Sequence, residues 1–209
     1  MAELIDIYDG NGNLIGAADR VVAHAFGLWH KTIHCWIICE GKLVFQRRSL
    51  KLSDNPGKLY TTASGHIKSG ESLRQAFERE VSQEIGIMVD DPKYLGEGPW
   101  VCDVKKSDGT YMFDKAFVNS FFAEYKGGLE DFKFNDGEVD SITAIDLAKF
   151  AEWSRKADGQ IDGIEWNGKI LSDVKLDDSD FLINPGETIY NKYGRPAERI
   201  KQETLVKNK

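Results

Sequence analysis

One segment, from Ser72 to Ile85, constrains the fold of this chain more than any other. Its apolar residues recur every four positions, which is the spacing of a helix that buries one face against a neighbouring layer. These residues are Leu73, Phe77, Val81 and Ile85. Gly86 follows directly and predicts the end of the helix.

Short apolar runs bounded by turn residues predict strands on both sides of this helix. The predicted strands are Leu4 to Tyr8, Leu14 to Ala17, Ile33 to Cys39, Leu43 to Phe45, Leu59 to Ala63, Tyr94 to Val104, Tyr111 to Tyr125 and Glu138 to Thr143. The first two form a predicted hairpin, and Ser107 to Thr110 predicts a second hairpin turn. A shorter helix is predicted from about Asp146 to Arg155.

Charge and composition limit the possible partners. The formal charge of −7 argues against duplex nucleic acid, which has to be held through many phosphates. A small phosphorylated ligand stays possible, because a local basic cluster or a bound cation can supply positive charge. No apolar run approaches the ~20 residues of a membrane span, and the first residues resemble no secretory signal. We therefore expect a cytoplasmic protein without a membrane partner.

Two carboxylates on the predicted helix suggest a metal site. Glu80 and Glu84 are four residues apart and share one helix face. Like charges at this spacing repel, and a divalent cation relieves the repulsion because hard cations prefer carboxylate oxygens. A solvated helix face is the alternative for an arbitrary pair of glutamates.

The wider pattern favours the metal site. Gly65 is followed after five residues by Glu71, and after seven more by the run Arg79 to Ile87. This arrangement resembles the Nudix box, G-x5-E-x7-R-E-U-x-E-E-x-G-U with U an apolar residue. Every defined position matches except Gln83, which stands where the family has a glutamate. A match with fixed gaps over this length is far more specific than a short glycine motif.

The resemblance implies an α/β/α sandwich with a mixed β-sheet, and it covers roughly residues 29–156. Residues 1–28 are then an N-terminal hairpin and lead-in, and residues 157–209 a C-terminal extension packed on the same domain. The implied activity is Mg²⁺-dependent hydrolysis of a diphosphate bond, with Mn²⁺ as a possible substitute. The substrate would be a nucleoside diphosphate derivative or another small X-linked diphosphate. A monomer or a homodimer is expected.

Family roles carry over to the matching residues. Glu80 and Glu84 are implied to bind the ion, with the Gly65 carbonyl and the Gln83 amide oxygen as further ligands. Arg79 and Glu71 are implied to be a pair that orients these carboxylates. Glu138 is the candidate for an additional family glutamate, with an exposed loop acid as its alternative. Either Glu80 or Glu138 then takes a proton from the attacking water.

Flanking residues narrow the resemblance to one branch. The run Arg47-Arg48-Ser49, Lys51 and the run Ser64-Gly65-His66 are similar to the corresponding stretch of isopentenyl-diphosphate isomerases and their hydrolase-like bacterial relatives. Arg47, Arg48, Lys51 and His66 become candidate substrate contacts on this basis. Arg offers a planar fork to a phosphate and Lys a point charge. A solvated surface charge is the alternative for each basic residue.

The isomerases also mark where this chain differs. They have a cysteine immediately before the Gly-His pair, where this chain has Ser64, and a hydroxyl is too weak an acid or base to replace a thiol. Two isomerase glutamates fall near Lys115 and Phe117, with Asp114 the acid nearby. Two alternative functions stay open. One is an isomerase, against which these differences argue. The other is a catalytically inactive ligand-binding module, which the departure from the box at Gln83 supports.

Four histidines leave a second type of metal site open. The isomerases use histidines from these regions, which here hold His24, His30, His34 and His66. Neutral imidazole is a common metal ligand, but these spacings match no fixed motif. Hydrogen-bonded histidines at a strand edge are the alternative.

Overall fold

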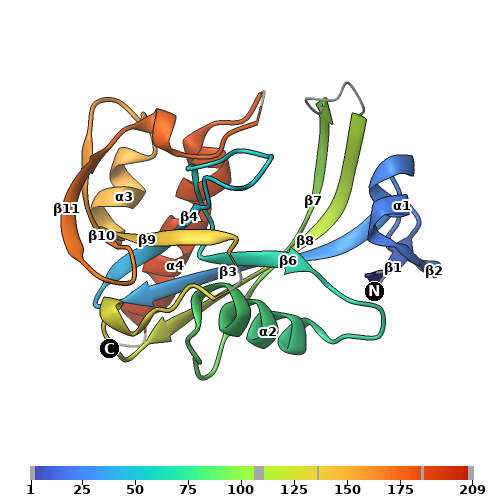
Figure 1. Ribbon diagram of the computed structural model, residues 1–209, viewed down its shortest axis with the longest axis horizontal. Helices are drawn as coiled ribbons and strands as arrows, with labels where there is room; N and C mark the ends of the chain where they lie inside the picture. The colour runs from blue at the N-terminus through green and yellow to red at the C-terminus, as the bar shows by residue number, and fades with distance from the viewer. Residues whose placement is uncertain (1–2, 106–110, 136, 185, 207–209) are drawn as a thin grey trace.

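The computed structural model describes residues 3–105, 111–135, 137–184 and 186–206 (Figure 1). Its strands are β1 (Leu4–Tyr8), β2 (Leu14–Asp19), β3 (Trp29–Cys39), β4 (Lys42–Arg48), β5 (Leu59–Tyr60), β6 (Ala63–His66), β7 (Lys93–Lys105), β8 (Tyr111–Tyr125), β9 (Val139–Asp146), β10 (Ile161–Trp166) and β11 (Leu171–Leu176). Its helices are α1 (Arg20–Phe26), α2 (Leu73–Ile85), α3 (Leu147–Trp153) and α4 (Arg195–Val206), with short helical turns η1 (Leu129–Asp131), η2 (Asp178–Asp180) and η3 (Tyr190–Gly194). The turn predicted from Ser107 to Thr110 lies outside the described residues.

The strands form one mixed sheet. Its main path runs β11-β10-β9-β4-β3-β1-β2, with β5 on β4, β6 and β8 on β3, and β7 on β8. The pair β3–β8 is parallel, and the other strand pairs are antiparallel. Helix α2 covers one face of the sheet, and α3 and α4 cover the other (Figure 1). This α/β/α arrangement around a mixed sheet confirms the predicted fold.

Helix α2 forms where its apolar spacing predicts it. Ser72 and Gln75 close a capping box at its start, in which each side chain accepts a hydrogen bond from the other residue's backbone N–H. Gly86 ends the helix in the left-handed conformation. Phe77 and Val81 are buried against the sheet, so the helix cannot rotate and its position relative to β6 is set.

Gly86→Ala is expected to destabilise the protein. Gly86 has a φ of 67°, and a Cβ there would lie 2.7 Å from the Lys133 carbonyl oxygen. The left-handed conformation costs about 1–2 kcal/mol for a non-glycine residue, and overpacking adds about 1–3 kcal/mol. We expect the free energy of unfolding, measured in urea, to fall by about 2–4 kcal/mol. Gly159→Ala is the control, because Gly159 has the same φ of 67° with nothing within 4 Å. Equal losses in the two variants would contradict the packing contribution.

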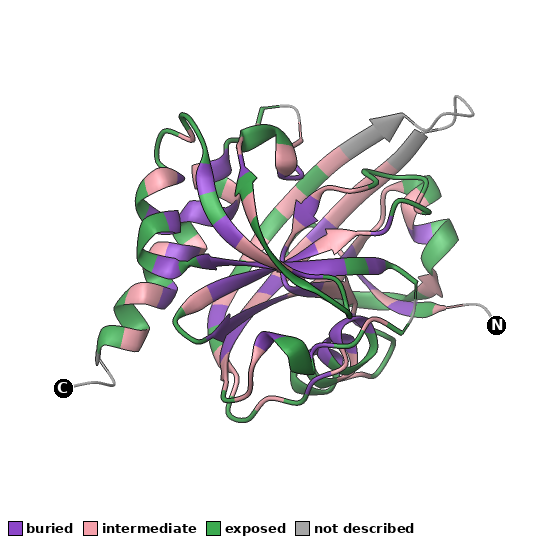
Figure 2. Ribbon diagram, turned by 60° about the vertical axis from the view of Figure 1, so that its left-hand side comes forward, coloured by how far each residue is buried: buried purple, intermediate pink, exposed green. Residues whose placement is uncertain are grey.

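The opposite face of the sheet carries the second core, which contains Trp36, Phe45 and Phe150. Figure 2 shows the buried residues concentrated in the central strands and on the inner faces of the helices. The C-terminal segment contributes to this core through Tyr193, which is fully buried and donates a hydrogen bond to the Leu182 carbonyl at 2.7 Å. The scattered apolar residues of this segment predict no element, yet it supplies β10, β11 and α4.

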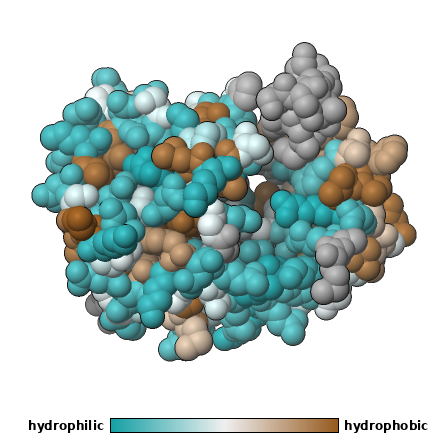
Figure 3. Space-filling model, viewed as in Figure 1, coloured by the Kyte–Doolittle hydropathy of each residue, from teal (hydrophilic) through white to brown (hydrophobic). Residues whose placement is uncertain are grey.

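The N-terminal segment closes the other end of the sheet. Strand β1 pairs with β3, and α1 follows the β1–β2 hairpin. Asp19 caps α1 by accepting a hydrogen bond from the Val21 backbone at 2.8 Å. Hydrophobic side chains are exposed on this part of the molecule, including Leu14, Ile15 and Phe26, and Figure 3 shows brown residues gathered there. No helix in the described part of the chain has the length and apolar character needed to cross a membrane.

Candidate active site

A cavity of about 950 Å³ opens beside α2 and β6. Its walls come from four parts of the chain, namely the N-terminal segment, β6 with the loop after it, α2, and the loop before β9. The lining residues are Glu3, Leu4, Arg20, Ser64, Gly65, His66, Lys68, Ser69, Arg79, Glu80, Ser82, Gln83, Glu84, Asn135 and Glu138. The sequence-predicted box residues therefore share one cavity with residues far away in the chain.

Glu80 and Glu84 are almost fully buried, with 7% and 5% of their surface exposed. The Glu84 carboxylate accepts hydrogen bonds from the Gln46 side chain at 3.1 Å and from the Ser64 backbone at 3.0 Å. Burial raises the pKa of Glu80, and the adjacent Arg79 opposes this shift. Two buried carboxylates on one helix face form an oxygen donor set that suits a hard divalent cation.

Gly65 allows the Glu80 carboxylate to approach the backbone of β6. A Cβ at this position would overlap the carboxylate atoms of Glu80. Since Gly65 pairs with Ile33 of the neighbouring β3, the backbone at this position is held by the sheet. A side chain at residue 65 and the observed position of Glu80 are therefore incompatible.

Arg79 ties α2 to the loop after β6. Its guanidinium contacts both oxygens of Glu71, with the Nε–Oε1 distance 2.7 Å and the Nη2–Oε2 distance 2.8 Å. It also donates to the His66 carbonyl at 2.8 Å and to Glu80 at 2.6 Å. The hydrogen bonds with Glu71 raise the pKa of Arg79. Burial alone would raise the pKa of Glu71, but hydrogen bonds from Arg79 and the Lys68 backbone lower it. The structure thus brings the predicted pair together and fixes Glu80 through it.

Gln83 and Glu138 lie at the rim of the cavity, and both are exposed. The Gln83 amide oxygen is 3.5 Å from Nη1 of Arg79. The loop carrying Glu138 is attached to the end of β4 by a hydrogen bond of 2.7 Å from the Ser49 backbone to the Glu138 carbonyl. Both side chains therefore line the same cavity as the buried carboxylates, at its solvent-exposed edge.

The structure places the predicted substrate-binding cations outside this cavity. Arg47 donates to Glu165 at 2.9 Å, and Arg48 donates to Asp54 at 2.7 Å. Lys51 lines a separate hollow. The cavity instead contains Arg20 and Lys68 beside Arg79.

Sequence reasoning missed Arg20 and Lys68. Arg20 begins α1, for which the sequence shows no clear helical period, and its guanidinium pairs with Glu3 at 3.0 Å. Lys68 occupies one of the variable positions between Gly65 and Glu71. The sequence signal that could have identified Lys68 is its positive charge inside the box.

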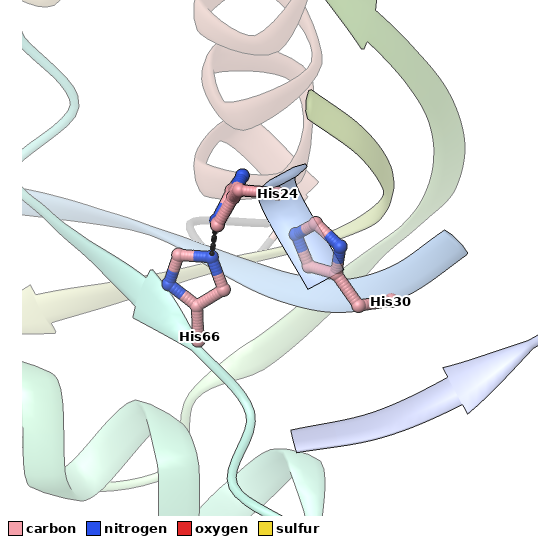
Figure 4. Close-up of side chains that lie close together, drawn as sticks. All are labelled: His24, His30 and His66. Atoms are coloured by element: carbon pink, nitrogen blue, oxygen red, sulfur yellow. Dashed lines mark hydrogen bonds between the residues drawn. The ribbon is translucent and has the colours of Figure 1, made fainter. Parts of the chain in front are cut away.

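Three of the four histidines form a cluster beside the cavity. His24 from α1, His30 from β3 and His66 from β6 each bring one ring nitrogen within 4.8 Å of the others (Figure 4). The Nε2 atoms of His24 and His66 are 2.9 Å apart. Burial and the nearby Arg20 lower the pKa of His66 to about 2. A neutral imidazole results, which is the form that binds metals.

Asp114 extends the histidine cluster. Its Oδ1 is 3.4 Å from Nε2 of His30 and 4.0 Å from Nδ1 of His24. Among the described residues, neither this oxygen nor Nε2 of His30 has a hydrogen-bond partner. His34 lies apart and is hydrogen-bonded to the Tyr60 hydroxyl at 2.9 Å, and burial lowers its pKa to about 3. Buried polar atoms without partners are costly, so this cluster suits an added ion or water.

Comparisons with known proteins agree with this geometry. The model of the NUDIX domain family matches residues 28–164. An uncharacterised Nudix hydrolase of Clostridium acetobutylicum is 30% identical over 200 residues, which cover 92% of each chain. An isopentenyl-diphosphate Delta-isomerase of Streptomyces griseus is 28% identical over 150 residues, covering 71% of this chain and 75% of the isomerase.

The fold is also found among solved structures. The MutT protein of Methanosarcina mazei superposes with a TM-score of 0.52 at 18% identity, covering 84% of this chain and 95% of that one. At this identity the likeness concerns the fold alone. The residues that the family model matches include α2, β6 and the loop before β9, which line the cavity. The chain therefore belongs to the Nudix family of hydrolases.

Proposed function

We propose that this protein hydrolyses a small X-linked diphosphate, such as a nucleoside diphosphate derivative, with Mg²⁺ as its ion and Mn²⁺ as a substitute. Family membership makes it an enzyme that acts on diphosphate-containing substrates. The observation that carries the finer proposal is the buried pair Glu80 and Glu84 at the wall of a cavity that is also lined by the cationic side chains of Arg20 and Lys68.

The residues present fit a hard divalent ion. Glu80 and Glu84 would hold it together with the carbonyl of Gly65, whose missing side chain leaves room for the Glu80 carboxylate. Gln83 and Glu138 would complete the set from the rim. When bound, such an ion polarises phosphoryl oxygens and lowers the pKa of a water.

The other residues of the cavity divide the remaining tasks. Arg20 and Lys68 offer positive charge to the phosphate oxygens of the substrate. Arg79 is committed to Glu71 and Glu80, so it orients a carboxylate and does not reach for substrate. Because the Glu80 carboxylate already accepts a hydrogen bond from Arg79, we assign Glu138 as the acceptor of the proton from the attacking water.

A substrate panel tests this proposal. Nucleoside diphosphate derivatives and non-nucleoside diphosphates are incubated with the protein in Mg²⁺ or Mn²⁺, and phosphate-bearing products are quantified. We expect turnover of at least one compound, loss of that turnover in EDTA, and recovery with excess Mg²⁺. Activity that persists in EDTA would overturn the metal assignment. Binding of a diphosphate without any turnover would favour the ligand-binding module.

Gln83→Glu is expected to lower the Mg²⁺ concentration that gives half-maximal activity. An added carboxylate about 4 Å from a divalent ion contributes about 2 kcal/mol in water, which corresponds to about a thirtyfold change. Gln202→Glu on the exposed surface of α4 adds the same charge far from the cavity and is the control. If both variants require as much Mg²⁺ as the unmodified protein, Gln83 does not contribute to the ion's surroundings.

Isomerisation of isopentenyl diphosphate is the second candidate function, and the cluster of His24, His30 and His66 with Asp114 favours it. These nitrogen donors suit a first-row transition ion better than Mg²⁺. Ser64 argues against isomerisation, because its hydroxyl cannot act as the proton donor or acceptor that a thiol would be.

Product analysis separates the two reactions. With isopentenyl diphosphate and either Mg²⁺ or Mn²⁺, we expect no dimethylallyl diphosphate above background. Isomerisation that disappears in Asp114→Asn or His30→Ala would show that the cluster serves this reaction. Elemental analysis of the purified protein and of His30→Ala establishes independently whether the cluster binds a transition metal.

A further inference from the structure

A second hollow, of about 420 Å³, lies on the other side of the loop that precedes β9. Three lysines from three separate loops contribute to its lining. Lys51 follows β4, Lys133 follows η1, and Lys169 lies in the turn between β10 and β11. All three are exposed. The fold therefore gathers at one place cations that are far apart in the sequence.

The charge around this hollow contrasts with that of the whole molecule. The chain has a formal charge of −7, yet in the described ranges none of these three ammonium groups is within ion-pair distance of a carboxylate. Asp140 also lines the hollow, and its carboxylate accepts a hydrogen bond from the Leu50 backbone at 2.9 Å. Three ammonium groups outnumber this one carboxylate, so the hollow keeps an excess of positive charge, and an anion placed there lowers the repulsion between the lysines.

The backbone that presents these lysines is well anchored. The Asn167 side chain accepts hydrogen bonds of 3.0 Å from the Lys169 and Ile170 backbones, which fixes the turn. A Cβ at Gly168 would lie 3.7 Å from the Phe134 ring, so this turn packs on the ring. The Lys133 backbone donates to the Ile85 carbonyl at 3.0 Å and is thereby held at the end of α2. Lys133 and Lys169 therefore extend from anchored backbone, so a ligand need not order these segments in order to bind.

One loop separates the hollow from the catalytic cavity. Asn135 and Glu138 line the cavity, whereas Phe134 and Gly137 line the hollow. A substrate that holds its diphosphate at the cavity and extends past this loop therefore meets the lysines. A phosphate group matches them, because several ammonium groups can each contact a different phosphate oxygen.

We propose that the hollow formed by Lys51, Lys133 and Lys169 binds a phosphate group. The group is either a second phosphate of the substrate, remote from the diphosphate that is cleaved, or free phosphate released by hydrolysis. Both sources of the phosphate rest on the proposed hydrolysis. The proposal that the hollow binds phosphate does not depend on that function.

Binding without turnover tests the site. Inorganic phosphate is titrated into the isotope-labelled full chain in EDTA, and backbone amide shifts are followed by NMR. We expect saturable shifts at Gly168, Lys169 and Phe134, and at least a tenfold loss of affinity in the triple variant Lys51→Gln, Lys133→Gln, Lys169→Gln. The triple variant Lys149→Gln, Lys156→Gln, Lys201→Gln makes the same charge change elsewhere and should leave the affinity unchanged. Absence of saturable shifts at these amides, or equal losses in both triple variants, overturns the proposal.

Kinetics then identifies the source. A compound hydrolysed in the panel is compared with its counterpart that has an additional phosphate, for example NADH with NADPH. A lower KM for the phosphorylated counterpart that is lost in the Lys51, Lys133 and Lys169 variant, with kcat retained, identifies the substrate. Unchanged KM values together with phosphate binding identify free phosphate. Because the NMR titration needs no reaction, failure of the hydrolysis panel would leave its outcome intact.

Discussion

Glu84→Gln is expected to lower kcat by about 10³-fold or more while the protein stays folded, which corresponds to about 4 kcal/mol of transition-state stabilisation. The substitution keeps the size of the side chain and removes its negative charge. The remaining amide oxygen can still accept the hydrogen bonds that the Glu84 carboxylate takes from Gln46 and the Ser64 backbone. The loss should therefore fall on ion binding and catalysis and spare the attachment of α2 to β6.

Glu78→Gln is the matched control for this experiment. Glu78 lies on the same helix, but its side chain is exposed and pairs with Arg74 at 2.8 Å. Removing its charge should change kcat by less than about twofold, because an exposed pair contributes at most about 1 kcal/mol to stability and nothing to the cavity. Urea unfolding should place both variants within about 1 kcal/mol of the unmodified protein. Turnover of Glu84→Gln at the level of Glu78→Gln would remove Glu84 from the ion site.

The part of the site that sequence could predict lies within one short segment. Glu71, Arg79, Glu80 and Glu84 are joined by a single helix and its preceding loop, so their relative positions follow from helix geometry and fixed gaps. Helix α2 itself was predictable because its apolar period and both caps agree with each other. Local signals of this kind do not depend on the rest of the chain.

The cations could not be assigned in this way. Arg47 and Arg48 sit next to each other in the sequence, and their similarity to the corresponding isomerase stretch favoured a phosphate role. The structure shows that Arg47 pairs with Glu165, which is 118 residues away in the sequence, and no local pattern reveals such a pair. Arg48 pairs with Asp54 in the loop that follows β4. Conversely, Arg20 enters the cavity only because the β1–β2 hairpin and α1 pack at the end of the sheet.

The C-terminal elements escaped prediction for a related reason. Strand β10 alternates poorly because it is covered on both faces, with Ile161 in one core and Trp166 in the other, and is paired on both edges with β9 and β11. Ile164 of β10 lies opposite Ala144 of β9. The position of β10 is therefore set by pairing with β9, which is separated from it in the sequence by α3 and a loop. Non-local pairing of this kind leaves little period in the sequence itself.

Gly65→Ala is expected to lower kcat by about 10²-fold and to raise the Mg²⁺ requirement, with a smaller effect on stability. The added methyl group would occupy the space of the Glu80 carboxylate, while β6 remains paired with β3 through the Gly65–Ile33 register. Glu80 is on a helix whose apolar face is buried, so it yields by rotating its side chain and not by moving its backbone. That rotation also breaks its contact with Arg79, which is 2.6 Å long in the structure.

A double substitution distinguishes this route from a general disturbance of the strand. If the methyl group acts by displacing the Glu80 carboxylate, Gly65→Ala should cost little further activity in a Glu80→Gln background, because the two changes remove the same interaction. Gly98→Ala in β7, where an added Cβ meets nothing within 4 Å, controls for alanine in place of a strand glycine and should keep full activity. Additive losses in the double variant would mean that Gly65 is required for something other than room for Glu80. The backbone carbonyl of Gly65 would then be the group to consider, since a shift of β6 moves that carbonyl while Glu80 stays in place.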